Sequence, residues 1–529
     1  MTAVPPIPPR AILAAALAAL AMAIFPLAAD HGAEFTRAAA AAGGGRSEVI
    51  VQVRPRASVR SVRAAVRRLG GDVTSRTLPV VNGFAARLSP AAARALAARD
   101  DVRAVSPNGE VRQRQFIPTT FLKTAYPGAV QADKVWNASM PATGKGIGVA
   151  VIDTGIDGDL TDFRASQTDP GSRVIASAVV NPGATTAGDG NGHGTHVAGL
   201  IAGNGSARAA DDPLTARYIG VAPEANLISV KVSDEAGATT VLDVLYGLQF
   251  VLDHRQRYGI RVVNLSLSST VAESAATDPL DAAVESVWLH GVVVVAAAGN
   301  SGTAPDAVSY APGNDPYVVS VGATDDGGTR VFGDDVVAPW SSRGVTLDGY
   351  AKPDALAPGA HIVSTLAPGS AFQQLCAACV EDGAYFRVGG TSMSAAVVSG
   401  VVADLLEVHP NWTPDQVKGA LRNTGATPAG SSVRAVRLQA ALGASGYQLT
   451  SNQGLTPSSA IDPATGDIDP TRASWRAASW RDASGSELDA EWAGASWRCD
   501  CSLKADGSVD PARASWRSAS WRRNSDFGK

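Results

Sequence analysis

The chain reads IGVAVIDTG at residues 147–155, an apolar run that ends on an aspartate. Comparable apolar, β-branched runs recur at residues 227–232, 262–267, 292–297 and 318–321. Strands that are apolar on both faces and alternate with helical stretches are typical of a buried parallel sheet. The sequence therefore predicts an α/β domain. Its last helices are expected at residues 392–408 and 413–423, the second with Thr413 as N-cap.

Two segments carry opposite charge. Residues 47–113 contain 12 Arg, 5 acidic residues and no Lys, a net charge of +7, whereas residues 114–470 carry −14. An acidic body binds polyanions poorly, which argues against nucleic acid as a partner. Because complementary fields favour encounter, we expect the basic segment to dock on the acidic one.

The basic segment has the pattern of a small domain of its own. Strands are expected at residues 48–53, 80–88 and 102–105, and helices at residues 61–69 and 90–99. This order fits a small α+β sandwich of the split βαβ, ferredoxin-like kind at residues 47–113.

The N-terminal residues have the pattern of a secretory signal. Arg10 precedes an apolar run at residues 11–29, and Asp30 follows it. We expect a signal peptide at residues 1–29, a linker at residues 30–46, and a secreted, extracellular protein. An uncleaved membrane anchor is the alternative, because the apolar run approaches the length that spans a bilayer.

Four cysteines lie in two close pairs, Cys376 with Cys379 and Cys499 with Cys501. An even count in an exported chain predicts disulfides, with three pairings open. Free thiols or a metal clip are the alternative, although no histidine accompanies them.

The C-terminal segment, residues 446–529, loses helical periodicity and contains six of the ten tryptophans. They form three doublets, most set as Ala-Ser-Trp-Arg: Trp475, Trp480, Trp492, Trp497, Trp516 and Trp521. Stacked tryptophans could build a repeat that contacts cell wall or polysaccharide. An extended low-complexity tail is the other interpretation, and both stay open.

Three motifs carry residues suited to nucleophilic catalysis. Asp153 ends the first strand, where ligand crevices form in open α/β sheets. His193 lies in GNGHGTHVAG at residues 190–199, and Ser392 lies in VGGTSMSAA at residues 388–396, where a helix starts. A serine nucleophile needs a base and a group that orients the base, and these residues supply both. His196 is the other candidate base, but it would begin the buried face of its helix.

Asn300 follows the run at residues 292–297 through an Ala-Gly pair. Its amide could donate to the oxygen that becomes negative during acyl transfer. Each motif alone is more often a helix cap or a turn. Together, in one α/β segment with glycines beside each, they indicate a serine hydrolase.

The order Asp, His, Ser with these flanking motifs resembles the subtilisin family over residues 129–444. The resemblance implies a subtilisin-like three-layer catalytic domain, residues 114–445, that acts as a serine endopeptidase on protein or peptide substrates through an acyl-enzyme. It also implies substrate pairing along Ser266, Leu267 and Ser268 and a specificity pocket bordered by Ala297, Ala298 and Gly299. The sequence departs from the family pattern at two positions. The family usually has Gly where Ser268 stands, so the serine side chain could narrow the substrate subsites. It usually has Pro where Ala396 stands, and the loss of that Pro should leave the chemistry intact.

The same resemblance implies that residues 47–113 are an inhibitory propeptide, removed by cleavage between residues 112 and 121. It implies no cofactor for catalysis. Structural calcium is common among relatives, but no loop here has an identifiable calcium spacing, so the metal stays unknown.

Two other functions are compatible with part of the sequence. An Asp-Thr-Gly block is also typical of pepsin-type aspartic proteases, which need a second such block that this chain lacks. A catalytically silent protein that binds peptides or wall polymers is the second rival, and the intact Asp153, His193, Ser392 and Asn300 argue against it.

Overall fold

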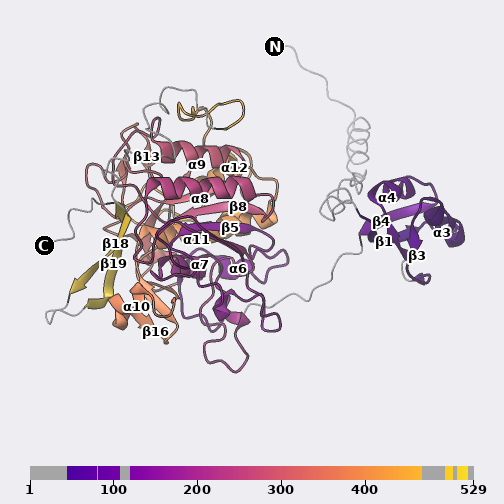
Figure 1. Cartoon of the computed structure of the whole chain (residues 1–529), viewed down its shortest axis with the longest axis horizontal. Helices are drawn as coiled ribbons and strands as arrows, with labels where there is room; N and C mark the ends of the chain where they lie inside the picture. The colour runs from indigo at the N-terminus through magenta and orange to yellow at the C-terminus, as the bar shows by residue number, and fades with distance from the viewer. Residues whose placement is uncertain (1–44, 80–81, 108–118, 468–494, 504–508, 522–529) are drawn as a thin grey trace, which may run out of the picture. The chain divides into compact units, whose positions relative to one another are not determined.

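The computed structural model describes residues 45–79, 82–107 and 119–467, and the backbone alone of residues 495–503 and 509–521 (Figure 1). The chain divides into two compact units, Met1–Gln115 and Phe116–Lys529. The expected signal peptide lies outside the described residues, as does most of the expected linker.

The described part of the first unit, residues 45–79 and 82–107, is a four-stranded antiparallel sheet with two helices. Its elements are β1 (Ser47–Val53), α3 (Val59–Arg68), β2 (Asp72–Val73), β3 (Gly83–Leu88), α4 (Pro90–Ala97) and β4 (Val102–Pro107). The strand order β2-β3-β1-β4 is that of a ferredoxin-like fold, which confirms the predicted class. Of these elements, β2 alone was not predicted, because two residues are too few to show the alternation of apolar and polar side chains that marks a strand.

The second unit is built on a sheet whose strand order is β11-β10-β9-β8-β5-β7-β6, with a further strand, β14, paired to β10. The bounds are β5 (Gly148–Asp153), β6 (Val174–Val179), β7 (Asn226–Lys231), β8 (Ile260–Leu265), β9 (Val293–Ala297), β10 (Val319–Asp325), β11 (Val336–Val337) and β14 (Ala355–Pro358). Every pairing except β10 with β11 is parallel. The predicted run at residues 262–267 leaves the sheet at Leu265, two residues early. The edge strand β6 was not predicted, although five of its six residues are apolar; in the structure its residues alternate between half-buried and exposed.

Helices cover both faces of this sheet and give the expected three layers (Figure 1). On one face α8 (Val241–His254) packs against α9 (Pro279–Leu289), and on the other α7 (His193–Ala202) packs against α11 (Thr391–Val408). Among the described helices, α11 alone has the length and hydropathy to cross a membrane. Its 18-residue apolar window is 89% buried, so it is the core helix of this unit.

After α11 the chain forms the predicted helix, and its ordered packing continues beyond the predicted end of the domain. Helix α12 (Pro414–Asn423) begins behind Thr413, whose side chain accepts from the Gln416 N–H in a capping box, as expected. Beyond the expected domain end at residue 445, Leu449 and Leu455 still pack against the core. Ordered packing of this unit therefore continues into the segment that the sequence placed in the tail.

Part of the tryptophan-rich tail forms an antiparallel hairpin of β18 (Ala495–Leu503) and β19 (Val509–Trp521). β19 lies against β17 (Tyr385–Val388) (Figure 1). Trp497, Trp516 and Trp521 belong to these strands, while the first doublet lies outside the described residues. Of the three cysteine pairings left open, the local one between Cys376 and Cys379 is formed.

One buried acidic cluster stands out in the second unit. Asp281, on α9, is fully buried, and neither carboxyl oxygen has a hydrogen bond of good geometry within the described residues, although the Asn314 side chain lies nearby. Burial, and then the charges of Asp278 and Asp315, raise the pKa of Asp281 well above the usual aspartate range. The neutral carboxyl group is therefore the form that this site accommodates.

A raised carboxyl pKa means that the folded state binds its proton more tightly than the unfolded chain. The resulting stability is present at low pH and is lost as pH rises above the normal aspartate range. We predict that Asp281→Asn, which cannot ionise, increases the free energy of unfolding at pH 8–9 by about 1–3 kcal/mol and changes it little at pH 4. Urea unfolding across this pH range measures the effect, and Asp253→Asn, a surface change on α8, is the control. Equal destabilisation of Asp281→Asn at every pH would contradict the prediction.

Candidate active site

The residues predicted to act together gather at one edge of the main sheet. Strand β8 lies between β5 and β9, and all three run parallel. Asp153 is the last residue of β5, Ser266 directly follows β8, and Ala297 is the last residue of β9. Because carboxyl ends of parallel strands meet at one edge, three segments distant in sequence face one crevice.

Asp153 is joined directly to His193. The Asp153 Oδ1 and His193 Nδ1 atoms are 2.7 Å apart, and both side chains are 1% exposed. The Thr154 N–H donates to the same carboxyl oxygen at 2.7 Å, which fixes the carboxylate. His193 is the first residue of α7, after Gly192 at φ +102°, so its ring stands at the start of the helix.

His196, the other candidate base, has a different environment. Its Nε2 atom lies 2.9 Å from the carbonyl oxygen of Phe386, and the side chain is fully buried. Burial lowers the pKa of His196 to about 3, so this ring is neutral at the pH of most proteins' function. Of the two histidines, the one bonded to Asp153 is His193.

Ser392 is the second residue of α11 and is 2% exposed. Its hydroxyl donates to the Ser266 carbonyl at 3.1 Å, and the Ser266 hydroxyl donates back to the Ser392 carbonyl at 2.8 Å. This reciprocal pair holds the start of α11 against the end of β8. In the first turn, backbone N–H groups have no acceptor within the helix and can face an anion.

Asn300 is oriented by the residue that precedes Ser392. Its Oδ1 atom accepts from both the N–H and the hydroxyl of Thr391, each at 2.9 Å. Two such bonds fix the plane of the amide, and its Nδ2 group is directed to the opposite side. The sequence identified Asn300 but not Thr391, whose role is visible only once the loop and helix meet.

The two predicted substrate segments lie side by side. The last ladder pair between their strands joins Leu265 to Ala296, so Ser266, Leu267 and Ser268 run beyond the ladder next to Ala297, Ala298 and Gly299. The Ser268 hydroxyl donates to the neighbouring Ser269 carbonyl at 3.0 Å. Its side chain is thereby held against its own backbone. Gly299 has φ +103°, and a Cβ there would lie 2.9 Å from Ser342 Oγ, so a side chain does not fit.

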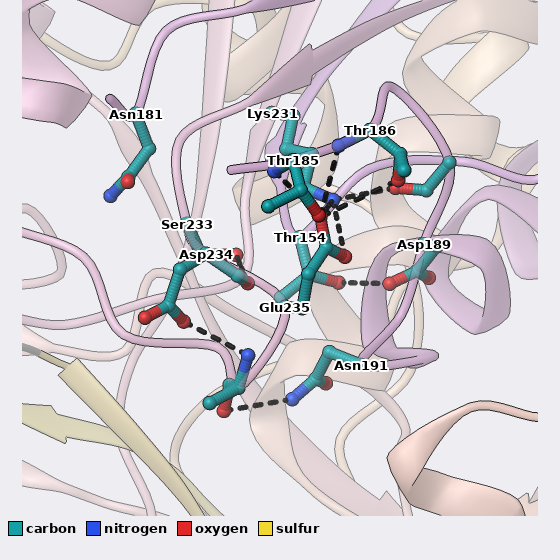
Figure 2. Close-up of polar contacts among 12 residues, drawn as sticks. Thr154, Asn181, Thr185, Thr186, Asp189, Asn191, Lys231, Ser233, Asp234 and Glu235 are labelled. Atoms are coloured by element: carbon teal, nitrogen blue, oxygen red, sulfur yellow. Dashed lines mark hydrogen bonds and ion pairs between the residues drawn. The ribbon is translucent and has the colours of Figure 1, made fainter. Parts of the chain in front are cut away.

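Asp189 was missed by the sequence analysis. One carboxyl oxygen accepts from the Thr154 hydroxyl at 2.8 Å (Figure 2). The same oxygen accepts from the Gly192 N–H at 2.7 Å, and the other oxygen accepts from the Thr195 N–H at 2.8 Å. It therefore ties the loop after Asp153 to the first turn of α7. An aspartate shortly before a helix is a capping signal, and that pattern could have revealed it.

A second polar cluster secures the loop that leads to His193. Lys231, fully buried at the end of β7, donates to both Glu235 carboxyl oxygens at 2.9 and 2.8 Å and to the Gly188 carbonyl at 2.7 Å. Glu235 also accepts from the N–H groups of Thr185 and Thr186 (Figure 2). Burial opposes ionisation, but the bonds from Lys231 and Thr185 prevail and lower the pKa of Glu235 to about 2.

No metal site emerges from the described part of the chain, where no three His, Cys, Asp or Glu side chains are grouped to hold an ion. Whether the chain binds the calcium that is common among relatives stays open.

The Glu235 cluster generates a stability prediction. A depressed carboxyl pKa gives stability that is present above the unfolded value and lost as pH falls from about 4.5 towards 2. We predict that Glu235→Gln lowers stability at pH 7 by about 1–2 kcal/mol, since buried Lys231 loses its counter-charge while partial exposure of Glu235 screens the pair. Thermal melts of both proteins should converge as the pH is lowered. Glu381→Gln, which breaks a surface pair with Arg387, is the matched control, and an equal loss in both variants would refute the assignment.

Comparison with known proteins bears on this arrangement. Residues 144–453 match the subtilase family, and residues 74–114 match the peptidase inhibitor I9 family. The chain is 37% identical to serine protease AprX of Bacillus subtilis over 350 residues, covering 65% of this chain and 74% of AprX. It is 36% identical to subtilisin Savinase of Lederbergia lenta, covering 57% of this chain and 91% of that protein. The solved structure of fervidolysin from Fervidobacterium pennivorans aligns with 76% of this chain and 61% of that one, at 26% identity and a TM-score of 0.45.

The family match covers more than half of the chain, and AprX shares well over 30% of its residues across most of its own length. An inhibitor-type domain precedes the protease domain, as in a precursor that is made inactive. The chain belongs to the subtilase family of serine proteases.

Proposed function

We propose that Ser392 is the nucleophile of this protease, His193 its general base and Asp153 the residue that orients the base. The observation that carries the proposal is the 2.7 Å contact between Asp153 Oδ1 and His193 Nδ1 at a buried sheet edge. With Nδ1 bonded to the carboxylate, Nε2 is the ring nitrogen that would take the proton from the nucleophile. Family membership supports the same assignment.

The reaction follows from these positions. With substrate bound, the Ser392 hydroxyl turns from the Ser266 carbonyl to His193, gives its proton to Nε2 and attacks the peptide carbonyl carbon. The imidazolium passes that proton to the leaving amine, and an acyl-enzyme remains on Ser392 Oγ. Water then gives a proton to His193 and attacks the ester carbonyl carbon. His193 returns that proton to Ser392 Oγ as the ester bond breaks, which releases the acid and restores the free enzyme. Asp153 stays ionised throughout and stabilises the imidazolium.

The developing oxyanion would be held by two donors. One is the Ser392 N–H in the first turn of α11, and the other is the Asn300 amide, set in place by Thr391. Because both are fixed before substrate arrives, little reorganisation is needed as charge develops.

An extended peptide would pair with Ser266, Leu267 and Ser268 by β-augmentation and place a side chain beside Ala297, Ala298 and Gly299. The hydrogen bond that turns Ser268 back on its own backbone supports an unobstructed strand, in spite of the glycine that relatives have there.

We further propose that the chain is secreted as a precursor and that residues 47–113 inhibit it until they are cut off between residues 112 and 121. The opposite net charges of residues 47–113 and 114–470, +7 and −14, support the association of these two segments. The signal-like residues 1–29 support export, with an uncleaved anchor as the alternative. A cell-wall or polysaccharide contact of residues 446–529 stays a prediction. In the tryptophan-bearing part of this segment, only the backbone of β18 and β19 is described.

Substitutions at the proposed centre should separate chemistry from folding. Ser392→Ala should abolish casein hydrolysis, a fall of about 10⁶-fold as known for a subtilisin, and Asn300→Ala should lower kcat by about 10²–10³-fold with little change in KM, also a magnitude known from a subtilisin. Both proteins should remain folded, as circular dichroism would show, although Asn300→Ala should melt at a lower temperature because it leaves the Thr391 N–H and hydroxyl without their acceptor. Unchanged casein hydrolysis by folded Ser392→Ala would remove the assignment and favour another nucleophile.

The precursor proposal predicts two N-termini. Sequencing secreted wild-type protein should give a mature chain that starts between residues 112 and 121. Secreted Ser392→Ala protein should instead start near residue 30 and retain the first unit, because self-cleavage needs the nucleophile. A Ser392→Ala protein that matures normally in a host lacking other proteases contradicts self-processing.

A further inference from the structure

Residues 366–384, between β15 (Ile362–Thr365) and β17, form a segment that the proposed mechanism does not use. It contains the short helix α10 (Ala371–Leu375), a 3₁₀ turn at Ala377–Cys379 and strand β16 (Val380–Glu381). Figure 1 shows α10 and β16 at the end of the unit where β18 and β19 lie. The Cys376–Cys379 disulfide closes the segment directly after α10.

One side chain of α10 packs on the proposed base. The ring of Phe372 is 2% exposed, and its centroid lies 5.9 Å from that of His193, with the two rings nearly perpendicular at 83°. The same ring lies 6.5 Å from His196 and 5.2 Å from Phe386. Edge-to-face contact at this distance is an attractive arrangement for aromatic rings. Phe372 therefore fills the space beside the imidazole.

The backbone of α10 is also bonded to the residues that lead into His193. The Phe372 N–H donates to the Asn191 carbonyl at 3.0 Å, and the Ala371 N–H donates to the Gly190 carbonyl at 2.9 Å. A Cβ at Gly192 would lie 2.6 Å from Ser370 Oγ, so the two segments touch without an intervening side chain. The position of α10 and the position of His193 are thus coupled.

A helix of five residues is too short to be stable through its own hydrogen bonds. The disulfide supplies the constraint. Cys376 and Cys379 are 3% and 0% exposed, and the Cys376 N–H donates to the Phe372 carbonyl at 3.2 Å. The cross-link therefore lies one turn from Phe372 and restricts the backbone that carries its ring.

We infer that Phe372 is a positioning residue for His193, held in place by the Cys376–Cys379 disulfide. The inference rests on the proposed role of His193 as general base. Asp153 fixes the imidazole by one edge, at Nδ1, but a single bond still permits the ring to tilt about it. The Phe372 ring blocks that tilt and excludes water from one side. Among the described residues, Asp153 from β5 is bonded to His193 and the neutral His196 lies one helical turn away. Asp189 is bonded to the nearby backbone N–H groups of Gly192 and Thr195.

The test uses Phe372→Ala and Phe372→Leu, with Leu375→Ala as the matched control because Leu375 is on the same helix and 51% exposed. Each mature enzyme is assayed with a peptide p-nitroanilide for kcat and KM, and over pH 5–10 for kcat/KM. We expect Phe372→Ala to lower kcat by about 10²-fold and Phe372→Leu by about 10-fold, the range that small misplacement of a catalytic group produces. KM should change less than about threefold, since substrate contacts are kept.

The pH profile distinguishes positioning from general destabilisation. Opening the site to water favours the charged imidazolium, so the midpoint of the acid limb of kcat/KM should move to higher pH in Phe372→Ala. The double variant Cys376→Ser with Cys379→Ser should show the same two changes in weaker form, and Leu375→Ala neither. If Phe372→Ala does not fold, Phe372→Leu and the cysteine variant carry the test by the same readouts.

Two results would overturn the inference. The first is that the folded Phe372 variants keep the wild-type kcat and the wild-type acid limb of kcat/KM. The second is that only KM rises, which would make Phe372 a substrate contact. The burst of product from an activated ester counts the active sites in every preparation. Wild-type enzyme with no burst and no turnover would refute the proposed function itself. A normal wild-type burst with unaltered variants refutes only the role of Phe372.

Discussion

The hydrogen bond between Asp153 and His193 is the interaction on which the rest of the site depends. It joins the end of β5 to the start of α7, and the hydrogen bonds of Asp189 and Thr154 tie the same two elements together. A buried carboxylate is costly unless it is bonded, and Asp153 accepts from both the imidazole and the Thr154 N–H. The cost of burial therefore enforces the geometry that the chemistry requires.

Hydrogen-bonded polar side chains also fix the other segments around the site. Asp189 joins Thr154 to the first turn of α7, Glu235 joins the preceding loop to Lys231, and Thr391 orients Asn300. Each polar group bridges segments far apart in the sequence. Catalytic side chains placed on loops and helix starts thus have the rigidity of the central sheet, which is what electrostatic preorganisation needs.

Long apolar runs predicted the central strands, and Thr413 as N-cap predicted helix α12, because both are strong local signals. Two strands were not predicted: β2 is two residues long, and β6 is rich in apolar residues but lies half-exposed at the sheet edge. The predicted strand to residue 267 ends at Leu265, since the last residues are turned out towards the site.

The proposed centre could be predicted from Asp153, His193, Ser392 and Asn300 because each lies in a short motif with glycines. The residues that orient them could not all be found in this way. Asp189 had a capping signal, but Thr391 and Phe372 owe their importance to contacts across 91 and 179 residues of chain respectively. Such contacts depend on how α11 and α10 pack, which no local pattern encodes. The same holds for Asp281, an acidic residue that is fully buried on helix α9.

The most direct measurement of the central claim is covalent labelling of mature, propeptide-free enzyme with a fluorophosphonate, followed by mass mapping of the modified peptide. We predict a single adduct on Ser392 in wild type, labelling slowed by about 10⁴-fold in Asp153→Asn and none in His193→Ala. An added protease removes the first unit from variants that do not process themselves, and all three proteins are checked to be folded before labelling. An adduct on another residue, or equal labelling rates in wild type and His193→Ala, would contradict it.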